Sequence, residues 1–356
     1  MKRNLVLVGY MAITVGILLG ADAFVSYLLS SERLNLAYYR AYIQVPLYYV
    51  TLAVSLNLIN GITGQFSLGH AGFVCVGAYL SAGFSYYYSE GWVQNFAPSV
   101  QPMAQGAFLF VAALIGGLSA AGAGLLVGIP CLRLRGDYLA IATLGFGEII
   151  RIIFENTQAQ GERFGFGGAR GFNDVPMWAG NGFFWNALLA VACIAVCRNF
   201  LKSTHGLAFL AVREDEVAAE AMGINTTRYK TLAFIIGAAF AGMAGTIFAH
   251  QEGVVAPRSF SVEISIMVVA MVVLGGQGSI TGAIVAGAGL TALSEALRFM
   301  PKFEAIGREF SPSDLRMVVF ALVLILAMIF RQQGLFGHRE IGWKSFRFRR
   351  RKPEAA

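Results

Sequence analysis

The sequence predicts an all-α protein that crosses a membrane about ten times. Of its 356 residues, 56% are hydrophobic and only 13% are charged, whereas charged residues make up roughly 25% of an ordinary soluble domain. The apolar residues alone would fill about ten helices of about 20 residues, the length that spans a bilayer. The 42 glycines are typical of membrane helices that pack closely. This composition excludes a soluble globular domain and a disordered chain.

Apolar runs place the spans in order along the chain. We expect them at residues 5–29, 41–60, 64–88, 106–129, 137–155, 182–200, 231–250, 262–280, 281–300 and 315–331. The first run follows Met1-Lys2-Arg3 but is longer than the apolar core of a signal peptide, which is about 7–15 residues, so we interpret it as an uncleaved span. Only residues 275–279 separate the eighth and ninth spans, which predicts a tight hairpin or a broken pair.

The basic residues predict the orientation. An even number of spans places both termini on one side, and 17 of the 27 Lys and Arg residues fall in segments on that side, which the positive-inside rule assigns to the cytoplasm. The outer segment 298–316 is an exception, with four basic residues. We therefore expect a transmembrane domain over 1–338 and a basic cytoplasmic tail over 339–356. The net charge of +7 is then explained by basic residues that orient the chain in the membrane. No nucleic-acid partner is expected.

The longest polar segment on the inner side, about 202–230, predicts a short amphipathic helix over about 214–223. Three acidic residues, Glu214, Asp215 and Glu216, stand where a helix N-terminus favours negative charge. Val217, Ala221 and Ile224 follow at helical spacing. Gly223 is placed to end the helix in a left-handed cap. Such a helix is either a docking site for a separate motor protein or an ordinary helix in a loop.

Two polar interruptions lie beside apolar runs. The first, at residues 61–70, contains Gly64, Gln65, Ser67, Gly69 and His70. The pattern Gly-Gln-x-Ser returns 212 residues later, at 276–279, with Gln277 and Ser279; it indicates either two related halves or chance. Irregular backbone in a membrane is tolerated where it is buried in protein or lines a cavity, and broken helices mark transport sites. The alternative is close helix packing through small residues.

Glu148 and Arg151 share one face of the fifth span. Because charges within a span are costly and usually face the bundle interior or a cavity, we expect Glu148 to face the bundle or the pathway. Arg151 has the alternative of snorkelling to the outer interface. The glycine-rich outer segment 155–181 is either a docking surface for a periplasmic binding protein or a flexible loop.

The sequence carries no evident catalytic or metal motif. It has no G-x-x-x-x-G-K-[ST] phosphate-binding loop, and its histidines, His70, His205, His250 and His338, are isolated in sequence. Cys193 and Cys197 share a helix face but have no further ligands nearby, so small packing residues are the expected role. The chain is therefore predicted not to be an enzyme and to bind no metal.

Three blocks, residues 56–82, 132–151 and 206–290, resemble branched-chain amino acid ABC transporter permeases of the type paired with a second, related permease. The most specific parts are Arg-Gly-Asp-Tyr-Leu-Ala from Arg135 and Arg-Glu-Asp-Glu from Arg213. The resemblance covers most of 56–331 and implies the ABC importer permease fold. Residues 216–223 stand in the place of the coupling segment, with Val217 where importers often have a glutamate.

The resemblance also implies the coupling residues and the partners. ATPase-coupling residues are expected at Arg213, Glu214, Asp215, Glu216, Ala218, Ala219, Glu220 and Gly223. From the polar interruptions and the charge within the fifth span, translocation-pathway residues are expected at Gly64, Gln65, Ser67, Gly69, His70, Glu148, Gln277 and Ser279.

The implied partners are a second related permease, two ABC ATPase subunits that bind ATP and Mg, and a periplasmic or lipid-anchored substrate-binding protein, with no cofactor on this chain. The implied location is the bacterial cytoplasmic (inner) membrane. Two alternatives remain. One is the same architecture for urea, short amides or other polar amino acids, and the other is a secondary transporter or channel without an ATPase.

Overall fold

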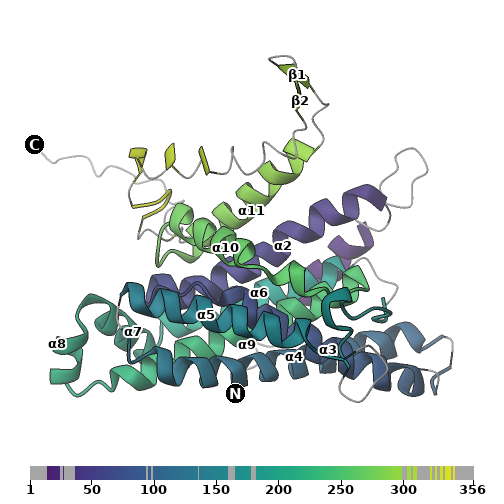
Figure 1. Ribbon diagram of the computed structural model, residues 1–356, viewed down its shortest axis with the longest axis horizontal. Helices are drawn as coiled ribbons and strands as arrows, with labels where there is room; N and C mark the ends of the chain where they lie inside the picture. Colours follow the sequence, from purple (N-terminus) through teal and green to yellow (C-terminus); the bar gives the residue numbers. More distant parts are fainter. Residues whose placement is uncertain are drawn as a thin grey trace, which may run out of the picture.

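A computed structural model describes residues 14–24, 27, 37–93, 95–97, 99–134, 136–158, 165–177, 182–298, 303–305 and 308–310, together with 321–322, 325–326, 329–331, 333–337 and 340. Over these residues the chain is almost entirely helical (Figure 1). The expected basic tail, 339–356, lies outside the described residues except for Glu340.

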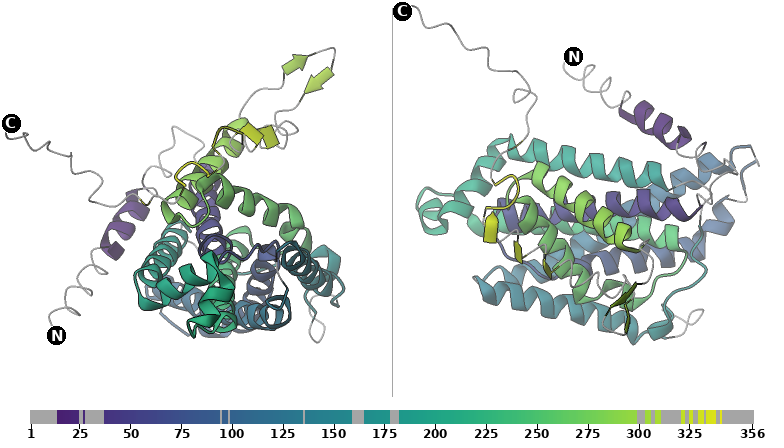
Figure 2. Two further views of the ribbon diagram at one scale, coloured as in Figure 1. Left: turned by 90° about the vertical axis from the view of Figure 1, so that its left-hand side faces the viewer. Right: turned by 90° about the horizontal axis from the view of Figure 1, so that it is seen from above.

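The helices from α2 to α11 run in one long bundle. They are α2 Ala37–Asn57 with its π-helical continuation η1 Leu58–Ile62, α3 His70–Val93, α4 Gln101–Cys131, α5 Asp137–Glu155, α6 Phe183–Leu201, α7 Thr204–Glu214, α8 Glu216–Ala221, α9 Thr226–Glu252, α10 Val262–Gly275 and α11 Ile280–Arg298. A further helix, Thr14–Phe24, stands apart from this bundle (Figure 2). Two single-turn 3-10 helices, η2 Gly168–Arg170 and η3 Pro257–Phe260, lie in the connections. Strands β1 Phe303–Ala305 and β2 Arg308–Phe310 form a small antiparallel hairpin.

The helices agree with the predicted spans. Each span from the second to the ninth contains one helix of the bundle, and among the described residues five helices are long and apolar enough to cross a membrane. The third span was expected to begin at residue 64, but helix α3 begins at His70 because residues 63–69 are not helical. The eighth span ends at Gly275 rather than 280, where a tight turn leads into α11.

Helix α9 lies at the centre of the bundle and packs against α3 and α4. Small residues allow this close approach: a β-carbon on Gly77 would overlap the backbone of Gly242, and one on Gly245 would overlap the carbonyl oxygen of Val74. The high glycine content therefore serves helix packing, as close membrane helix contacts require. Seen end-on in Figure 2, the helices surround this centre.

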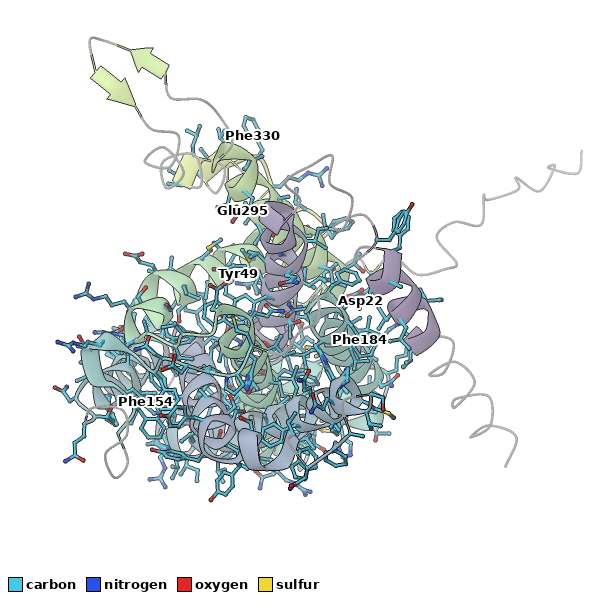
Figure 3. The ribbon with its side chains drawn as sticks, turned by 90° about the vertical axis from the view of Figure 1, so that its right-hand side faces the viewer. Asp22, Tyr49, Phe154, Phe184, Glu295 and Phe330 are labelled. Carbon is cyan, nitrogen blue, oxygen red and sulfur yellow. The ribbon has the colours of Figure 1, made fainter. Side chains whose placement is uncertain are left out.

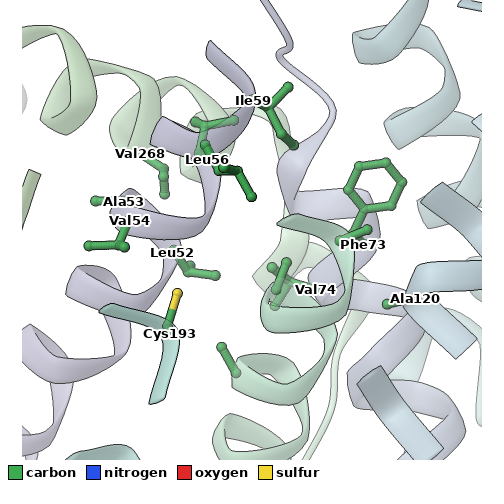
Figure 4. Packing of buried hydrophobic residues seen from close by; sticks show 14 of the residues in the cluster. Leu52, Ala53, Val54, Leu56, Ile59, Phe73, Val74, Ala120, Cys193 and Val268 are labelled. Atoms are coloured by element: carbon green, nitrogen blue, oxygen red, sulfur yellow. The ribbon is translucent and has the colours of Figure 1, made fainter. Parts of the chain in front are cut away.

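Helix α2 forms a second packing centre. Its buried residues Leu52 and Leu56 belong to the same buried cluster as Val74 of α3 (Figure 4), and its neighbours are α6, α9, α10 and α11. Figure 3 shows Phe330, which is largely exposed, apart from the bundle that holds Tyr49 and Phe154. The core is therefore built from helices between α2 and α11, and Phe330 lies outside it.

Candidate functional site

Helices α7 and α8 stand together at one end of the bundle (Figure 1). Asp215 separates them with an extended backbone, φ −155° and ψ 111°, and its Oδ1 accepts hydrogen bonds from Val217 N at 2.9 Å and Ala218 N at 3.0 Å. This side chain is an N-cap, which supplies an acceptor to the free amides of the first turn. The predicted single helix over 214–223 is therefore wrong at its start, because Arg213 and Glu214 end α7 and the next helix begins at Glu216.

The end of α8 follows the prediction. Gly223 has φ +84°, the left-handed conformation that glycine adopts at low cost. No atom lies within 4 Å of the position that a β-carbon on Gly223 would occupy. Glycine is therefore required here by backbone geometry and not by lack of space.

Two polar contacts attach α8 to the first turn of α9. Lys230 Nζ lies 2.6 Å from Glu216 Oε1, with the lysine side chain only 9% exposed. Thr226 Oγ1 donates to Glu220 Oε1 at 2.6 Å, and Ala219 is buried between these contacts. Glu216 and Glu220 thus face α9 and hold α8 against it.

The opposite face of α8 is apolar and exposed. Val217 is 64% exposed and Met222 is 82% exposed, and Ala218 and Ala221 are exposed beside them. Leu207 of α7 is also exposed. We call the set Leu207, Val217, Ala218, Ala221 and Met222 the α7–α8 patch. Exposed apolar groups on a polar segment are typical of an interaction site.

Residues 63–69 form a non-helical segment between η1 and α3, in which Thr63, Gln65, Ser67 and Gly69 are buried and Gly64 and Phe66 are exposed. Asn60 holds it through two hydrogen bonds: its Oδ1 accepts from Ser67 N at 3.1 Å, and its Nδ2 donates to Ser67 O at 3.3 Å. Leu68 N donates to Thr143 Oγ1 at 3.0 Å. Thr143 lies six residues after Asp137, the first residue of α5, which places this contact roughly 9 Å along the helix. The segment therefore lies inside the bundle.

The predicted pathway residues in this segment differ in their surroundings. Gln65 and Ser67 are buried, and their side-chain polar atoms have no hydrogen-bond partner among the described residues. His70 is buried at the start of α3, with Nε2 2.9 Å from Ser55 Oγ. Gly69 packs so closely on α5 that a β-carbon would overlap Thr143 O. Gly64, by contrast, is exposed.

The second Gly-Gln-x-Ser segment lies against residues 57–61, which precede the first one in the chain. Gly278 N donates to Asn57 Oδ1 at 2.9 Å across 221 residues of sequence. A β-carbon on Gly61 would overlap Gly278 N. The two segments are not equivalent in detail, because Gln277 is exposed, and Ser279 Oγ accepts from Gly282 N at 3.0 Å as a cap of α11.

Glu148 lies apart from this cluster, on α5. Arg151 Nε is 2.8 Å from Glu148 Oε2, and Arg151 Nη1 is 2.7 Å from Glu155 Oε2. The three side chains are 20–32% exposed and form one ladder along the flank of the helix. Sequence reasoning missed Glu155, although its spacing of four from Arg151 was the available signal.

The remaining candidates show structural roles. His250 Nε2 lies 2.7 Å from Ser85 Oγ, and the four cysteines are buried and free. Within the described ranges no three His, Cys, Asp or Glu residues come together as metal ligands.

The outer segment 155–181 is described in part. Phe172 N donates to Val255 O at 2.8 Å, and Val255 N donates to Phe172 O at 2.9 Å. These two hydrogen bonds tie the segment to the loop after α9. Docking of a binding protein there stays a prediction.

Comparisons with known proteins identify the family. Residues 38–328 match the family described as branched-chain amino acid transport system, permease component. The high-affinity branched-chain amino acid transport system permease protein LivM of Escherichia coli is 35% identical over 320 residues, which are 81% of this chain and 67% of LivM. The permease protein LivH of the same organism is 33% identical over 140 residues, 39% of this chain and 42% of LivH.

A weaker likeness is structural. PsaBC from Streptococcus pneumoniae in complex with Fab is similar at a TM-score of 0.40 and 15% identity, over 86% of this chain and 95% of that one. The sequence matches carry the assignment, and they confirm that the chain is a multi-pass transport subunit and not an enzyme. The chain belongs to the branched-chain amino acid transport permease family.

Proposed function

We propose that this chain is the membrane-spanning permease subunit of a binding-protein-dependent ABC importer of branched-chain amino acids. The observation that carries the proposal is the arrangement of α8, whose glutamates bind α9 while the α7–α8 patch is exposed. A rigid projection with an apolar outer face fits a docking site for a separate ATPase subunit. The relatives named for high-affinity branched-chain amino acid transport support the substrate class.

The orientation and partners follow from this arrangement. The end of the bundle with α7 and α8 faces the cytoplasm, and both termini lie on that side, in keeping with the positive-inside rule. Two ATPase subunits bind ATP and Mg there. A second, LivH-like permease completes the membrane part, and a periplasmic or lipid-anchored binding protein delivers substrate to the outer face, which includes residues 165–177.

The pathway is proposed to pass beside the non-helical segment 63–69. Buried polar atoms without a protein partner, as at Gln65 and Ser67, are costly unless water or a polar solute satisfies them. His70, Gly64, Gly69, Gln277 and Ser279 shape this region, and Glu148, farther along α5, is proposed to face the pathway at a separate point. Charges within a span usually face a cavity or another protein chain.

Co-purification of the complex tests the docking site. We expect wild-type permease to carry two ATPases and a second permease with it, and Met222→Glu to lose the ATPases because a carboxylate in the patch must be desolvated on docking. Met222→Leu is the matched control and should retain them. Full retention of the ATPases by Met222→Glu would remove the case for docking at this patch.

Uptake into proteoliposomes tests the substrate class. The complete complex with its binding protein should take up leucine, isoleucine or valine only when ATP is supplied. Uptake of urea or a short amide instead would favour the alternative cargo. Leucine uptake by the permease pair alone, without ATPases, would favour a secondary transporter.

A further inference from the structure

Arg213 lies between two glycine turns that belong to different parts of the membrane domain. It is in the last turn of α7. A β-carbon on Gly64 would lie 3.2 Å from Arg213 Cγ and 3.6 Å from Arg213 Cβ. A β-carbon on Gly278 would lie 2.6 Å from Arg213 Nη1. The side chain therefore passes along Gly64 with its stem and reaches Gly278 with its guanidinium.

The turn at Gly278 is also in direct contact with the end of α2 and with η1. Gly278 N donates to Asn57 Oδ1, and Gly61 has no room for a side chain against Gly278 N. Both Gly64, with φ +69°, and Gly278, with φ +90°, have backbone conformations that favour glycine. The end of α2 and the turn between α10 and α11 thus form one packed unit, with Arg213 against it.

A second contact holds the same turn from the C-terminal side. Leu335 N donates to Leu274 O at 2.8 Å, and Phe336 N donates to Gly275 O at 3.2 Å. Glu340 Oε2 accepts from Thr281 Oγ1 at 2.7 Å. The turn between α10 and α11 is therefore held by Arg213 on one side and by residues 335–340 on the other. A displacement of Arg213 then moves the whole turn and does not bend it locally.

We propose that Arg213 is a positioning residue that transmits movement of the α7–α8 pair to the turns at 61–64 and 276–278, and through them to α2, α10 and α11. This inference rests on the proposed function, because the movement originates in the partner ATPases. Closely packed contacts transmit displacement because they leave no free volume to absorb it. Arg213 thus couples α7 to the turns at Gly64 and Gly278, whereas the α7–α8 patch binds the ATPase.

The test measures ATP hydrolysis and leucine uptake by the complete complex with its binding protein in proteoliposomes. Arg213→Ala should retain ATPase activity and lower the leucine taken up per ATP on the order of tenfold, within the usual range of coupling between sites. Arg213→Lys, which keeps the aliphatic stem and a cation, should restore part of the ratio. Arg228→Ala is the matched control, because Arg228 is exposed on the first turn of α9. An unchanged ratio in Arg213→Ala overturns the proposal.

A cross-link gives a second measurement that does not depend on the alanine variant assembling. The separation of 3.6 Å between Arg213 Cβ and a β-carbon at position 64 suits a disulfide, for which about 3.5–4.5 Å is normal. The double variant Gly64→Cys, Arg213→Cys replaces the arginine contact with a covalent one, and cysteine at position 64 keeps the left-handed backbone, which costs more for cysteine than for glycine. Its oxidised form should keep most of the leucine taken up per ATP, and its reduced form should lose it as Arg213→Ala does. Equal ratios in the oxidised and reduced forms overturn the proposal. Absence of ATP-driven uptake by the wild-type complex would overturn the proposed function and the positioning role with it.

Discussion

At the scale of single residues, the four acidic side chains within 214–220 divide by what they contact. Glu216 and Glu220 bond to the start of α9, whereas Asp215 caps α8 and Glu214 is exposed at the end of α7. The sequence shows only that four acidic residues stand near one another. Their division depends on the angle at which α8 lies against α9, so sequence reasoning could not assign it.

The pairing of Glu216 with Lys230 makes a testable prediction. Glu216→Gln leaves the lysine ammonium, which is largely buried, without a charged partner, and we expect a cost of about 1–3 kcal/mol in the local stability of α8. Hydrogen exchange of the amides of residues 216–222 in the intact complex should become faster. Glu214→Gln, at an exposed position two residues away at the end of α7, is the control and should leave the exchange unchanged. Equal exchange in both variants would contradict the role of the pair.

At the scale of elements, the N-cap at Asp215 decides that the polar loop is two helices. Aspartate competes for backbone amides and therefore favours helix starts over helix interiors. The sequence predicted a helix start in this region, and its exact position required the observed hydrogen bonds to Val217 and Ala218. The cap sets the direction of α8 and hence the position of the α7–α8 patch.

Removing the N-cap tests whether Asp215 stabilises the start of α8. Asp215→Ala should destabilise α8 by about 1 kcal/mol, the usual value of an N-cap, and should weaken ATPase binding without loss of membrane insertion. Asp215→Asn keeps an acceptor oxygen and should behave almost as wild type. The affinity of the purified ATPase for permease in detergent is the measurement, and equal affinities for the alanine and asparagine variants would argue against capping.

The non-helical segment shows a further limit of reasoning by element. The glycine and polar residues at 61–70 correctly predicted an interruption. They did not show that Asn60 accepts a hydrogen bond from Ser67 N or that Gly69 packs on Thr143. Those contacts join residues of different helices, and local backbone preference carries no information about them.

At the scale of the whole molecule, the arrangement of helices predicts the topology. The α7–α8 end of the bundle and the turn between α10 and α11 lie together, since Arg213 contacts Gly278. Both belong on the cytoplasmic side if the spans alternate. A fluorescent reporter at the C-terminus should therefore be active in the cytoplasm, and an alkaline phosphatase fused after residue 171 should be active outside. The reverse pattern would show that the orientation is inverted.

The amino-acid sequence by itself determined the membrane class, the order of the helices and the family, because these depend on composition, on apolar runs and on motifs that are contiguous in the chain. Only the tertiary structure decided that α8 turns its glutamates toward α9 and that Arg213 lies against two glycine turns, at Gly64 and Gly278. The second of these turns is hydrogen-bonded to Asn57 across 221 residues of sequence. Such contacts depend on the packing of helices distant in sequence. In the membrane that packing is set by the shapes of small residues and by individual hydrogen bonds. A hydropathy profile records neither the shapes nor the hydrogen bonds.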